Sequence, residues 1–306
     1  MVYNITINTD DNYIQHAMAM LCSLYENNKG HELHLHVLQN NMTDASKSLI
    51  RDLSNAYGHG VDFYDVDHSK LEGVQFRKNR PLSMAAYYRL LFCSVLPSEV
   101  DRVLYLDCDI IVVKDISEIF DIEIENYALA ACLDTIPYTS QHRLQMHMEV
   151  DERTFCSGVM LVNLKYWREH DVEPGLLEYA KRKRKEVWLH DQDVLNYYFK
   201  KKWFLLPPKW NRIANLLRAL DYPYYKDFDR KEYLLDPMLY HFADMSMKPW
   251  FNAASPCRNF YMEYLRKSGY KDVKFKEVAP LTRLKWKLKT MKYNLLYNLY
   301  KTIRAY

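Results

Sequence analysis

The chain has 306 residues, enough for one large α/β domain with an appendage or for two modest domains with well-buried cores. Its 49% of hydrophobic residues, 26% of charged residues and net charge of +3 are typical of globular proteins and exclude disordered and collagen-like classes. Only seven residues are glycine, and no third glycine follows Gly58 and Gly60 at the spacing of a dinucleotide fingerprint or a P-loop, which excludes a glycine-rich phosphate cradle.

The first 135 residues predict strands that alternate with helices. Strands are expected at 2–8, 32–38, 61–66 and 102–106, and the β-rich segment IIVV (110–113) follows the last of them. Helices are expected between the strands, at about 13–28, after the N-cap Thr43 and at 83–96. Because repeated β-α-β units place successive strands in parallel, this pattern predicts a mostly parallel sheet with right-handed crossovers.

The rest of the chain has a mixed pattern, with no internal repeat and no sharp boundary before about residue 250. Strands are expected at 127–133 and 158–164, and helices at about 173–186, 191–201 and 256–268. Prolines and aromatic clusters in the segment 203–240 predict short strands and loops there. A separate helical tail is expected from about residue 281.

Two carboxylates follow the buried strand 102–106. Asp107 and Asp109 lie one residue apart at its carboxyl end, the edge of an open α/β sheet where ligands gather. Across a tight turn both can reach one hard divalent cation, so the pair indicates a metal site. An ordinary strand-to-turn pair of acids is the alternative.

Polar residues also follow the first predicted strand. Asp10 and Asn12 carry groups that can read the donor and acceptor edge of a base, and the ring of Tyr13 can stack on it. The alternative, which these residues alone favour, is a helix N-cap with acids in the first turn.

Two further segments carry groups suited to a site. His190–Asp193 (HDQD) opens a predicted helix, where the acids complement the helix dipole and a structural role is the default for at least one of them. His241 and Lys248 lie on one predicted loop, before Pro249 and Trp250. A lone histidine after a strand is usually structural, but this pair can supply a third metal ligand and a cation for a diphosphate.

Taken together and in order over about residues 1–250, these segments resemble glycosyltransferase family 8. This group of retaining GT-A enzymes contains bacterial lipopolysaccharide galactosyl- and glucosyltransferases and glycogenin. The resemblance is carried by the strand-DDNY start, YYRL (87–90), RVLYLDCDIIVVKDISEIF (102–120), ACLD (131–134), FCSGVMLVNLKYWREH (155–170), HDQDVLN (190–196) and the H…KPW loop. It implies a Rossmann-like α/β fold of GT-A type, a single domain with a mostly parallel central sheet and a C-terminal helical tail.

The resemblance also implies a domain organisation and an activity. Residues 1–255 are expected to form the catalytic domain, with a nucleotide-sugar-binding half at about 1–135 and an acceptor-binding half at about 136–255, followed by a helical extension at 256–306. The implied activity is that of a UDP-hexose-dependent hexosyltransferase, which moves galactose or glucose to a saccharide acceptor in lipopolysaccharide or other surface glycan synthesis. A non-catalytic nucleotide-sugar or glycan binding protein and a metal-dependent phosphohydrolase are the alternatives.

The motifs assign the metal and the diphosphate to four residues. Asp107, Asp109 and His241 are implied to bind Mn²⁺, with Mg²⁺ as the alternative ion, and Lys248 is implied to contact the donor diphosphate. Two carboxylates and one imidazole suit Mn²⁺ better than zinc, which prefers sulfur and nitrogen ligands. The negative charge that develops on the leaving UDP needs such preorganised positive charge.

The remaining donor contacts are also implied by the resemblance. Asp10, Asn12 and Tyr13 are expected to hold the uridine. Arg89 and Asp134 are expected to line the donor sugar.

The residues expected at the reacting carbon are Gln192 and, beside it, Asp191 in contact with the sugar. Retention normally suggests a double displacement with an enzyme nucleophile. Because a neutral amide oxygen cannot form a stable glycosyl ester, we expect front-face attack through an oxocarbenium-like pair, with the Gln192 amide as an electrostatic stabiliser.

The sequence departs from the family pattern at two positions. Cys156 stands in the segment FCSG where the family usually has asparagine. Asp244 stands where the common loop pattern H-x-x-G-x-x-K-P-W has glycine, and one extra residue precedes Lys248. These departures concern a donor-sugar contact and the closure of the loop over the diphosphate.

The tail 281–306 contains seven basic residues and no acidic ones, so the first 280 residues carry a net charge of −4. Helical spacing separates a stripe of Leu284, Leu288, Met291, Leu295 and Leu299 from a nearly opposite stripe of Trp286, Tyr293, Tyr297 and Tyr300. This pattern favours peripheral attachment to an anionic membrane surface, with docking on the catalytic domain or a dimer contact as alternatives.

The sequence also indicates where the chain is expected to act. No run approaches the roughly 18 apolar residues of a spanning helix, and no signal peptide is recognised, so we expect a cytoplasmic protein on the inner face of the cytoplasmic membrane. Six dispersed cysteines fit reduced thiols better than disulfides. The run KRKRK (181–185) favours a solvated helix face, so no nucleic-acid partner is expected.

Overall fold

The computed structural model describes residues 2–74, 84–135, 140–149, 152–182, 189–213 and 235–304. The chain divides into two compact units, each built from segments that are distant in the sequence. The first unit comprises Met1–Asn12, Gly30–Asp107 and Ser117–Leu206, and the second comprises Tyr13–Lys29, Cys108–Ile116 and Pro207–Tyr306. The expected domain boundary at residue 255 stays a prediction.

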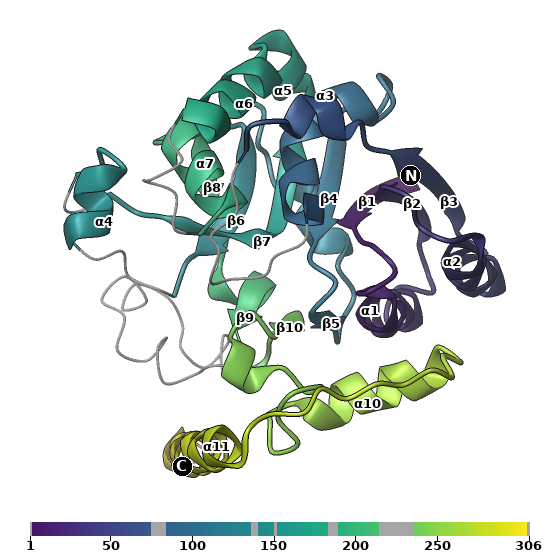
Figure 1. Ribbon diagram of the computed structural model, residues 1–306, viewed down its shortest axis with the longest axis vertical. Coiled ribbons are helices and arrows are strands. Elements are labelled where there is room, and N and C mark those ends of the chain that lie inside the picture. Colours follow the sequence, from purple (N-terminus) through teal and green to yellow (C-terminus); the bar gives the residue numbers. More distant parts are fainter. Residues whose placement is uncertain are drawn as a thin grey trace. The chain divides into compact units, whose positions relative to one another are not determined.

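A seven-stranded sheet forms the centre of the first unit (Figure 1). Its order is β3-β2-β1-β4-β7-β6-β8, with β1 (Val2–Asn8), β2 (Glu32–Gln39), β3 (Gly60–Asp65), β4 (Arg102–Leu106), β6 (Leu129–Leu133), β7 (Phe155–Asn163) and β8 (Trp203–Leu205). Strand β7 is antiparallel to both of its neighbours, and the other pairings among the described strands of this sheet are parallel. The predicted α/β class with a mostly parallel sheet is confirmed.

Helices and 3₁₀ turns connect these strands. They are α2 (Asp44–Ala56), η1 (His68–Leu71), η2 (Met84–Leu91), α3 (Phe92–Val95), η3 (Ser117–Asp121), α4 (Ser140–Gln145), α5 (Leu164–Glu169), α6 (Val172–Arg182) and α7 (Asp191–Tyr198). The expected helix 83–96 is a 3₁₀ helix followed by one short α-helix. Residues 87–91 are all buried there, so packing on several sides overrides the local preference for one amphipathic α-helix.

The second unit contains a small sheet and the C-terminal helices. Its elements are α1 (Ile14–Glu26), β5 (Ile110–Val112), η4 (Pro208–Asn211), β9 (Arg212–Ile213), β10 (Leu239–His241), η6 (Met245–Met247), α10 (Arg258–Lys267) and α11 (Pro280–Arg304). The sheet order is β5-β10-β9, with β10 antiparallel to β5 and parallel to β9. The β-rich segment after Asp109 therefore belongs to a different sheet from β4, and the predicted tail helix is present as α11.

Helix α1 is almost entirely buried and packs against α10. The side chain of Gln15 donates a hydrogen bond to the hydroxyl of Tyr261 at 3.0 Å, and Asn27 donates to the hydroxyl of Tyr264 at 2.9 Å. Because α1 is apolar on most sides, it can be stable only inside a packed core, and α10 supplies part of that core.

Parts of several predicted segments lie outside the described residues. Residues 183–185 of the basic run lie there, together with the end of the helix expected at 173–186. So do residues 214–234 of the segment 203–240 and the last two residues of the tail. Within the described ranges, no helix has the length and apolar character required to cross a membrane.

Thr43 is the N-cap of α2, as its position predicts. Its side-chain oxygen accepts a hydrogen bond from the backbone N–H of Ser46 at 3.3 Å. We expect Thr43→Ala to lower the free energy of unfolding by about 1 kcal/mol, because an N–H at the helix start loses its acceptor. Thr43→Ser, which keeps an oxygen there, is the control. Urea unfolding followed by circular dichroism measures both, and an unchanged stability of Thr43→Ala would contradict the assignment.

Candidate functional site

A buried arginine connects three parts of the first unit. Arg89 extends from η2, and its guanidinium donates to Asp107 Oδ1 at 2.9 Å and to the backbone oxygen of Ser157 at 2.8 Å. Its Nε lies 3.2 Å from Asp191 Oδ2. These partners come from the end of β4, from β7 and from the first turn of α7. Because a buried cation is tolerated only when it is paired, the two carboxylates account for the position of Arg89.

Asp107 is oriented through its backbone and its side chain. Its N–H donates to the carbonyl oxygen of Gly158 at 2.9 Å, which continues the pairing of β4 with β7 by one residue. The hydroxyl of Tyr105 donates to Asp107 Oδ1 at 2.5 Å, and the guanidinium of Arg89 lies 4.3 Å from the centre of the Tyr105 ring. The carboxylate of Asp107 is therefore held at the sheet edge by two donors.

The pKa values of both Arg89 and Asp191 are raised above their usual values in this network. Burial alone would lower the pKa of Arg89, but Asp191 and Asp107 hold it above its usual value. Burial and the nearby charge of Asp107 raise the pKa of Asp191 to about 6, and Arg89 opposes that rise only in part. A carboxyl with a raised pKa beside a fixed cation is typical of functional sites.

The amide of Gln192 is fixed on both sides. Its oxygen accepts a hydrogen bond from the backbone N–H of Ser157 at 3.0 Å, and its nitrogen donates to Asp134 Oδ2 at 2.7 Å. The hydroxyl of Ser157 donates to Asp191 Oδ2 at 3.2 Å. The first unit thus brings together five of the residues predicted for the site, namely Arg89, Asp107, Asp134, Asp191 and Gln192.

Asp10 and Asn12 follow β1, as predicted. The backbone N–H of Asn12 donates to Asp10 Oδ1 at 3.0 Å. Asp11, between them, instead accepts hydrogen bonds from the backbone N–H of Thr43 at 3.2 Å and from its hydroxyl at 2.9 Å. Asp11 therefore has a structural role at the start of α2.

The second unit brings together another group of predicted site residues. Lys248, which follows η6, forms an ion pair with Asp109 and donates to the hydroxyl of Tyr13 at 3.3 Å. Tyr13 is the residue that precedes α1, and Asp109 precedes β5. Burial alone would raise the pKa of Asp109, but the ammonium of Lys248 holds it well below its usual range, so this carboxylate is ionised.

His241 completes this group. Its Nε2 lies 3.3 Å from Asp109 Oδ1, and its Nδ1 lies 3.0 Å from the side-chain oxygen of Asn211. Because an amide oxygen only accepts hydrogen bonds, Nδ1 donates to Asn211, and this bond holds the ring so that Nε2 faces the carboxylate of Asp109. Metal-binding histidines are commonly oriented by such a bond from the other ring nitrogen.

The contacts of Ser157, Asn211 and Asp244 were not predicted from the sequence. Ser157 lies in the segment FCSG, beside the departure at Cys156, which is buried in β7. Asn211 carries no local signal, because it lies 30 residues before its partner His241. Asp244 caps η6 and pairs with Lys289 of α11, at 3.0 Å.

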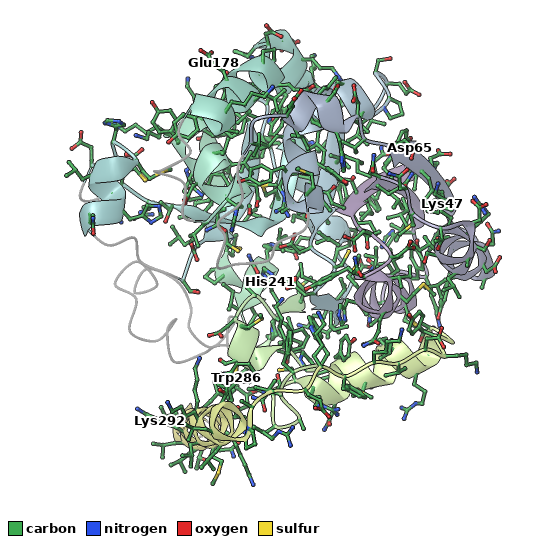
Figure 2. All side chains as sticks on the ribbon, viewed as in Figure 1. Lys47, Asp65, Glu178, His241, Trp286 and Lys292 are labelled. Carbon is green, nitrogen blue, oxygen red and sulfur yellow. The ribbon has the colours of Figure 1, made fainter. Side chains whose placement is uncertain are left out.

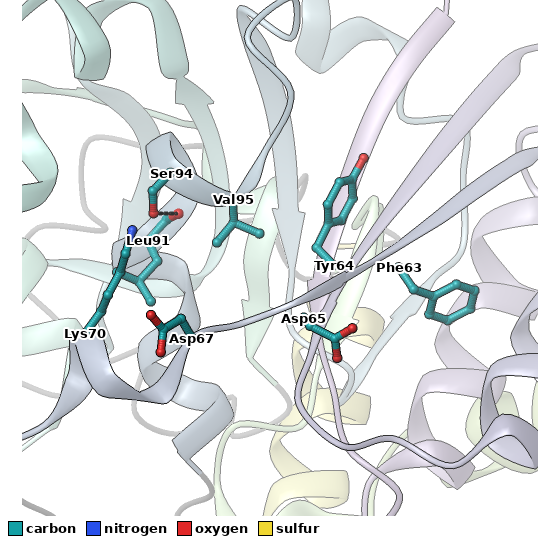
Figure 3. Close-up of a pocket in the computed structure, with 8 residues that line it drawn as sticks. All are labelled: Phe63, Tyr64, Asp65, Asp67, Lys70, Leu91, Ser94 and Val95. Carbon is teal, nitrogen blue, oxygen red and sulfur yellow. Dashed lines mark hydrogen bonds between the residues drawn. The ribbon is translucent and has the colours of Figure 1, made fainter.

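A pocket of about 310 Å³ lies beside β3 in the first unit (Figure 3). It is lined by Phe63, Tyr64, Asp65, Asp67, Lys70, Leu91, Ser94 and Val95. Lys70 lies 3.6 Å from Glu173, which also accepts a hydrogen bond from the backbone N–H of Ser94 at 2.9 Å. None of the residues predicted for the site lines this pocket.

The fold is the GT-A fold of a known transferase. The structure matches that of galactosyltransferase LgtC, solved in complex with donor and acceptor sugar analogues, with a TM-score of 0.78 at 23% sequence identity. The match covers 94% of this chain and 99% of the LgtC chain. The α/β unit with its mostly parallel sheet is therefore the arrangement found in that enzyme.

The chain belongs to glycosyl transferase family 8, whose model matches residues 4–254. It is 29% identical over 274 residues to general stress protein A of Bacillus subtilis (strain 168), which covers 86% of this chain and 93% of that protein. It is 25% identical over 299 residues to a lipopolysaccharide 1,2-glucosyltransferase of Escherichia coli, which covers 95% of this chain and 86% of the enzyme.

Asp191 should make the stability of the protein depend on pH. Its carboxyl titrates at about 6 in the folded protein and near 3.8 when unfolded, so the folded state binds more protons between these values and stability falls as the pH rises through them. Asn mimics the protonated carboxyl. We expect the stability of Asp191→Asn relative to the wild type to increase by about 2 kcal/mol between pH 4 and pH 7.

Urea unfolding of both proteins across this pH range measures the difference. Asp52→Asn, which removes an exposed carboxylate on α2, is the matched control and should show no such trend. A stability difference between Asp191→Asn and the wild type that does not vary with pH would contradict the raised pKa.

Proposed function

We propose that this chain is a UDP-hexose-dependent hexosyltransferase that moves galactose or glucose, with retention of configuration, to a saccharide acceptor in lipopolysaccharide or other surface glycan synthesis. Family membership and the similarity to a lipopolysaccharide glucosyltransferase support this function. The observation that carries it is the network around Arg89, in which polar groups suited to a sugar converge in one buried place.

The proposed metal ligands are Asp107, Asp109 and His241, with Mn²⁺ as the ion and Mg²⁺ as the alternative. Only Cys108 separates the two acids, so their Cα atoms are at most about 7 Å apart. Carboxylate oxygens and one imidazole nitrogen form a donor set that fits Mn²⁺, and Nε2 of His241 already faces Asp109. A bound ion would supply positive charge to the leaving diphosphate.

Lys248 is proposed to contact the donor diphosphate. Burial alone would lower the pKa of its ammonium, but Asp109 and Tyr13 raise it above its usual value, so Lys248 is charged at neutral pH. On donor binding it would exchange part of its contact with Asp109 for the phosphate oxygens. Tyr13, together with Asp10 and Asn12, is proposed to hold the uridine.

The groups proposed at the reacting carbon favour front-face attack. The oxygen of Gln192 is a neutral amide oxygen that already accepts a hydrogen bond from Ser157, and Asp191 is paired with Arg89. Neither side chain is a strong nucleophile in this state. We therefore propose that Gln192 stabilises an oxocarbenium-like centre electrostatically, with Asp191 beside it and with Arg89 and Asp134 along the sugar.

The metal assignment predicts the behaviour of two acid variants. With Mn²⁺ and UDP-galactose or UDP-glucose, Asp107→Asn and Asp109→Asn should each lower the rate of UDP release by about 10²-fold or more, because preorganised charge at the diphosphate is lost. Chelation of the metal should lower wild-type turnover similarly, while Asp52→Asn should leave it unchanged. Wild-type rates in both site variants would exclude this mechanism, and UDP binding without turnover would indicate a binding protein.

Helix α11 is proposed to attach the protein to the inner face of the cytoplasmic membrane. Its inward side packs within the second unit, where the ring of Trp286 meets Phe251 edge to face and Tyr293 is buried. Its outward stripe is 53% to 68% exposed and consists of Leu281, Leu284, Leu288, Met291, Leu295 and Leu299. Lysines such as Lys292 lie on the same helix, which carries no acid (Figure 2). Exposed leucines among basic residues fit an anionic lipid surface.

The outward stripe predicts binding to anionic vesicles. The double variant Leu288→Ser and Leu295→Ser should lower partitioning onto phosphatidylglycerol vesicles by about tenfold or more, because two leucine side chains no longer leave water. Leu144→Ser, which removes a leucine that is 77% exposed on α4, is the matched control. Flotation of the vesicles measures the bound fraction, and equal partitioning of the double variant and the wild type would refute the attachment.

A further inference from the structure

The loop from Asp244 to Asn252 carries Lys248 and is held by hydrogen bonds at both ends. Oδ1 of Asp244 accepts from the backbone N–H of Ser246 at 2.9 Å and from its hydroxyl at 2.8 Å. The backbone N–H groups of Phe251 and Asn252 donate to the carbonyl oxygen of Lys248 at 3.1 and 3.0 Å. The backbone of Lys248 is therefore fixed between a cap and a turn.

Two consecutive residues of α11 contact this loop. The ammonium of Lys289 donates to Asp244 Oδ2 at 3.0 Å and to the hydroxyl of Ser246 at 2.6 Å. The side-chain amide of Asn252 donates to the carbonyl oxygen of Ser246 at 2.8 Å and to the hydroxyl of Thr290 at 3.2 Å. Helix α11 thus contacts the loop on both sides of Lys248.

The charge of Asp244 is compensated by Lys289. The side chain of Asp244 is 18% exposed, and burial alone would raise its pKa, but hydrogen bonds from Lys289 and Ser246 lower it to about 2. This carboxylate is therefore ionised at neutral pH in a largely buried position. Without the ammonium, a buried charge would be left with hydrogen bonds alone, which favours rearrangement of the loop.

We propose that Lys289 is a positioning residue for donor binding, which through Asp244 and Ser246 holds the loop so that Lys248 meets the diphosphate of a nucleotide sugar. This role rests on the proposed function and extends it to α11. A loop already held in its binding arrangement loses less conformational entropy when the ligand arrives. The family pattern has glycine, a flexible residue, at the position of Asp244. In this chain the same position is occupied by a side chain that Lys289 holds in place.

Binding of UDP with Mn²⁺ to the full chain, measured by calorimetry without lipid, tests this role. Lys289→Met should weaken UDP binding about fivefold and leave uridine binding unchanged, because uridine has no diphosphate to meet Lys248. Lys289→Arg, which keeps a cation near Asp244, should bind UDP like the wild type. Asp244→Asn should weaken UDP similarly to Lys289→Met, and the double variant should be no weaker than either single variant, because both act through one contact.

Lys292→Met is the matched control, since it removes the same charge from an exposed position of the same helix. Equal UDP affinities of Lys289→Met and the wild type would overturn the role of Lys289 and leave the proposed function standing. A loss of UDP affinity in Lys292→Met as large as that in Lys289→Met, or equal losses for UDP and uridine, would also overturn it. Failure of the wild type to bind UDP would overturn the proposed function together with this role.

Discussion

The buried guanidinium of Arg89 is the interaction on which the polar network of the first unit depends. It joins the end of β4, the middle of the sheet at Ser157 and the start of α7. Without it, Asp107 and Asp191 would share a poorly hydrated place with no cation between them, which proteins resolve by protonation or rearrangement. Even with Arg89 the pKa of Asp191 is about 6, so the ionised carboxylate of Asp191 lowers the free energy of unfolding at neutral pH.

In the second unit, each of the acids Asp109 and Asp244 is paired with a lysine that keeps its pKa low, in contrast to Asp191 in the first unit. Lys248 holds Asp109 ionised, and Asn211 directs the ring of His241 toward the same carboxylate. A second acid and lysine, Asp244 and Lys289, hold the loop that carries Lys248. In both units, polar side chains are oriented before any ligand binds, and preorganised charge of this kind is the largest contribution to many enzymatic rate enhancements.

Much of the fold could be predicted because its strands and helices have recognisable patterns in the local sequence. Buried strands such as 102–106 are continuous apolar runs, and acids that directly follow a strand lie at the sheet edge where ligands gather. The rest depends on contacts between distant residues. Arg89 meets Ser157 across 68 positions, and Lys289 meets Asp244 across 45. Strand β5 pairs with β10 and does not extend the main sheet. The residues next to β5 in the sequence do not indicate this pairing.

A donor screen with Mn²⁺ present shows whether these groups serve the proposed transfer of a hexose from a UDP-sugar. Mass spectrometry of a reaction with a saccharide acceptor would follow both the UDP released and the sugar transferred. We expect UDP and a hexose-extended acceptor in equal amounts from UDP-galactose or UDP-glucose, and neither product after chelation of the metal. Release of free phosphate in place of UDP, or no product from any donor, would contradict it.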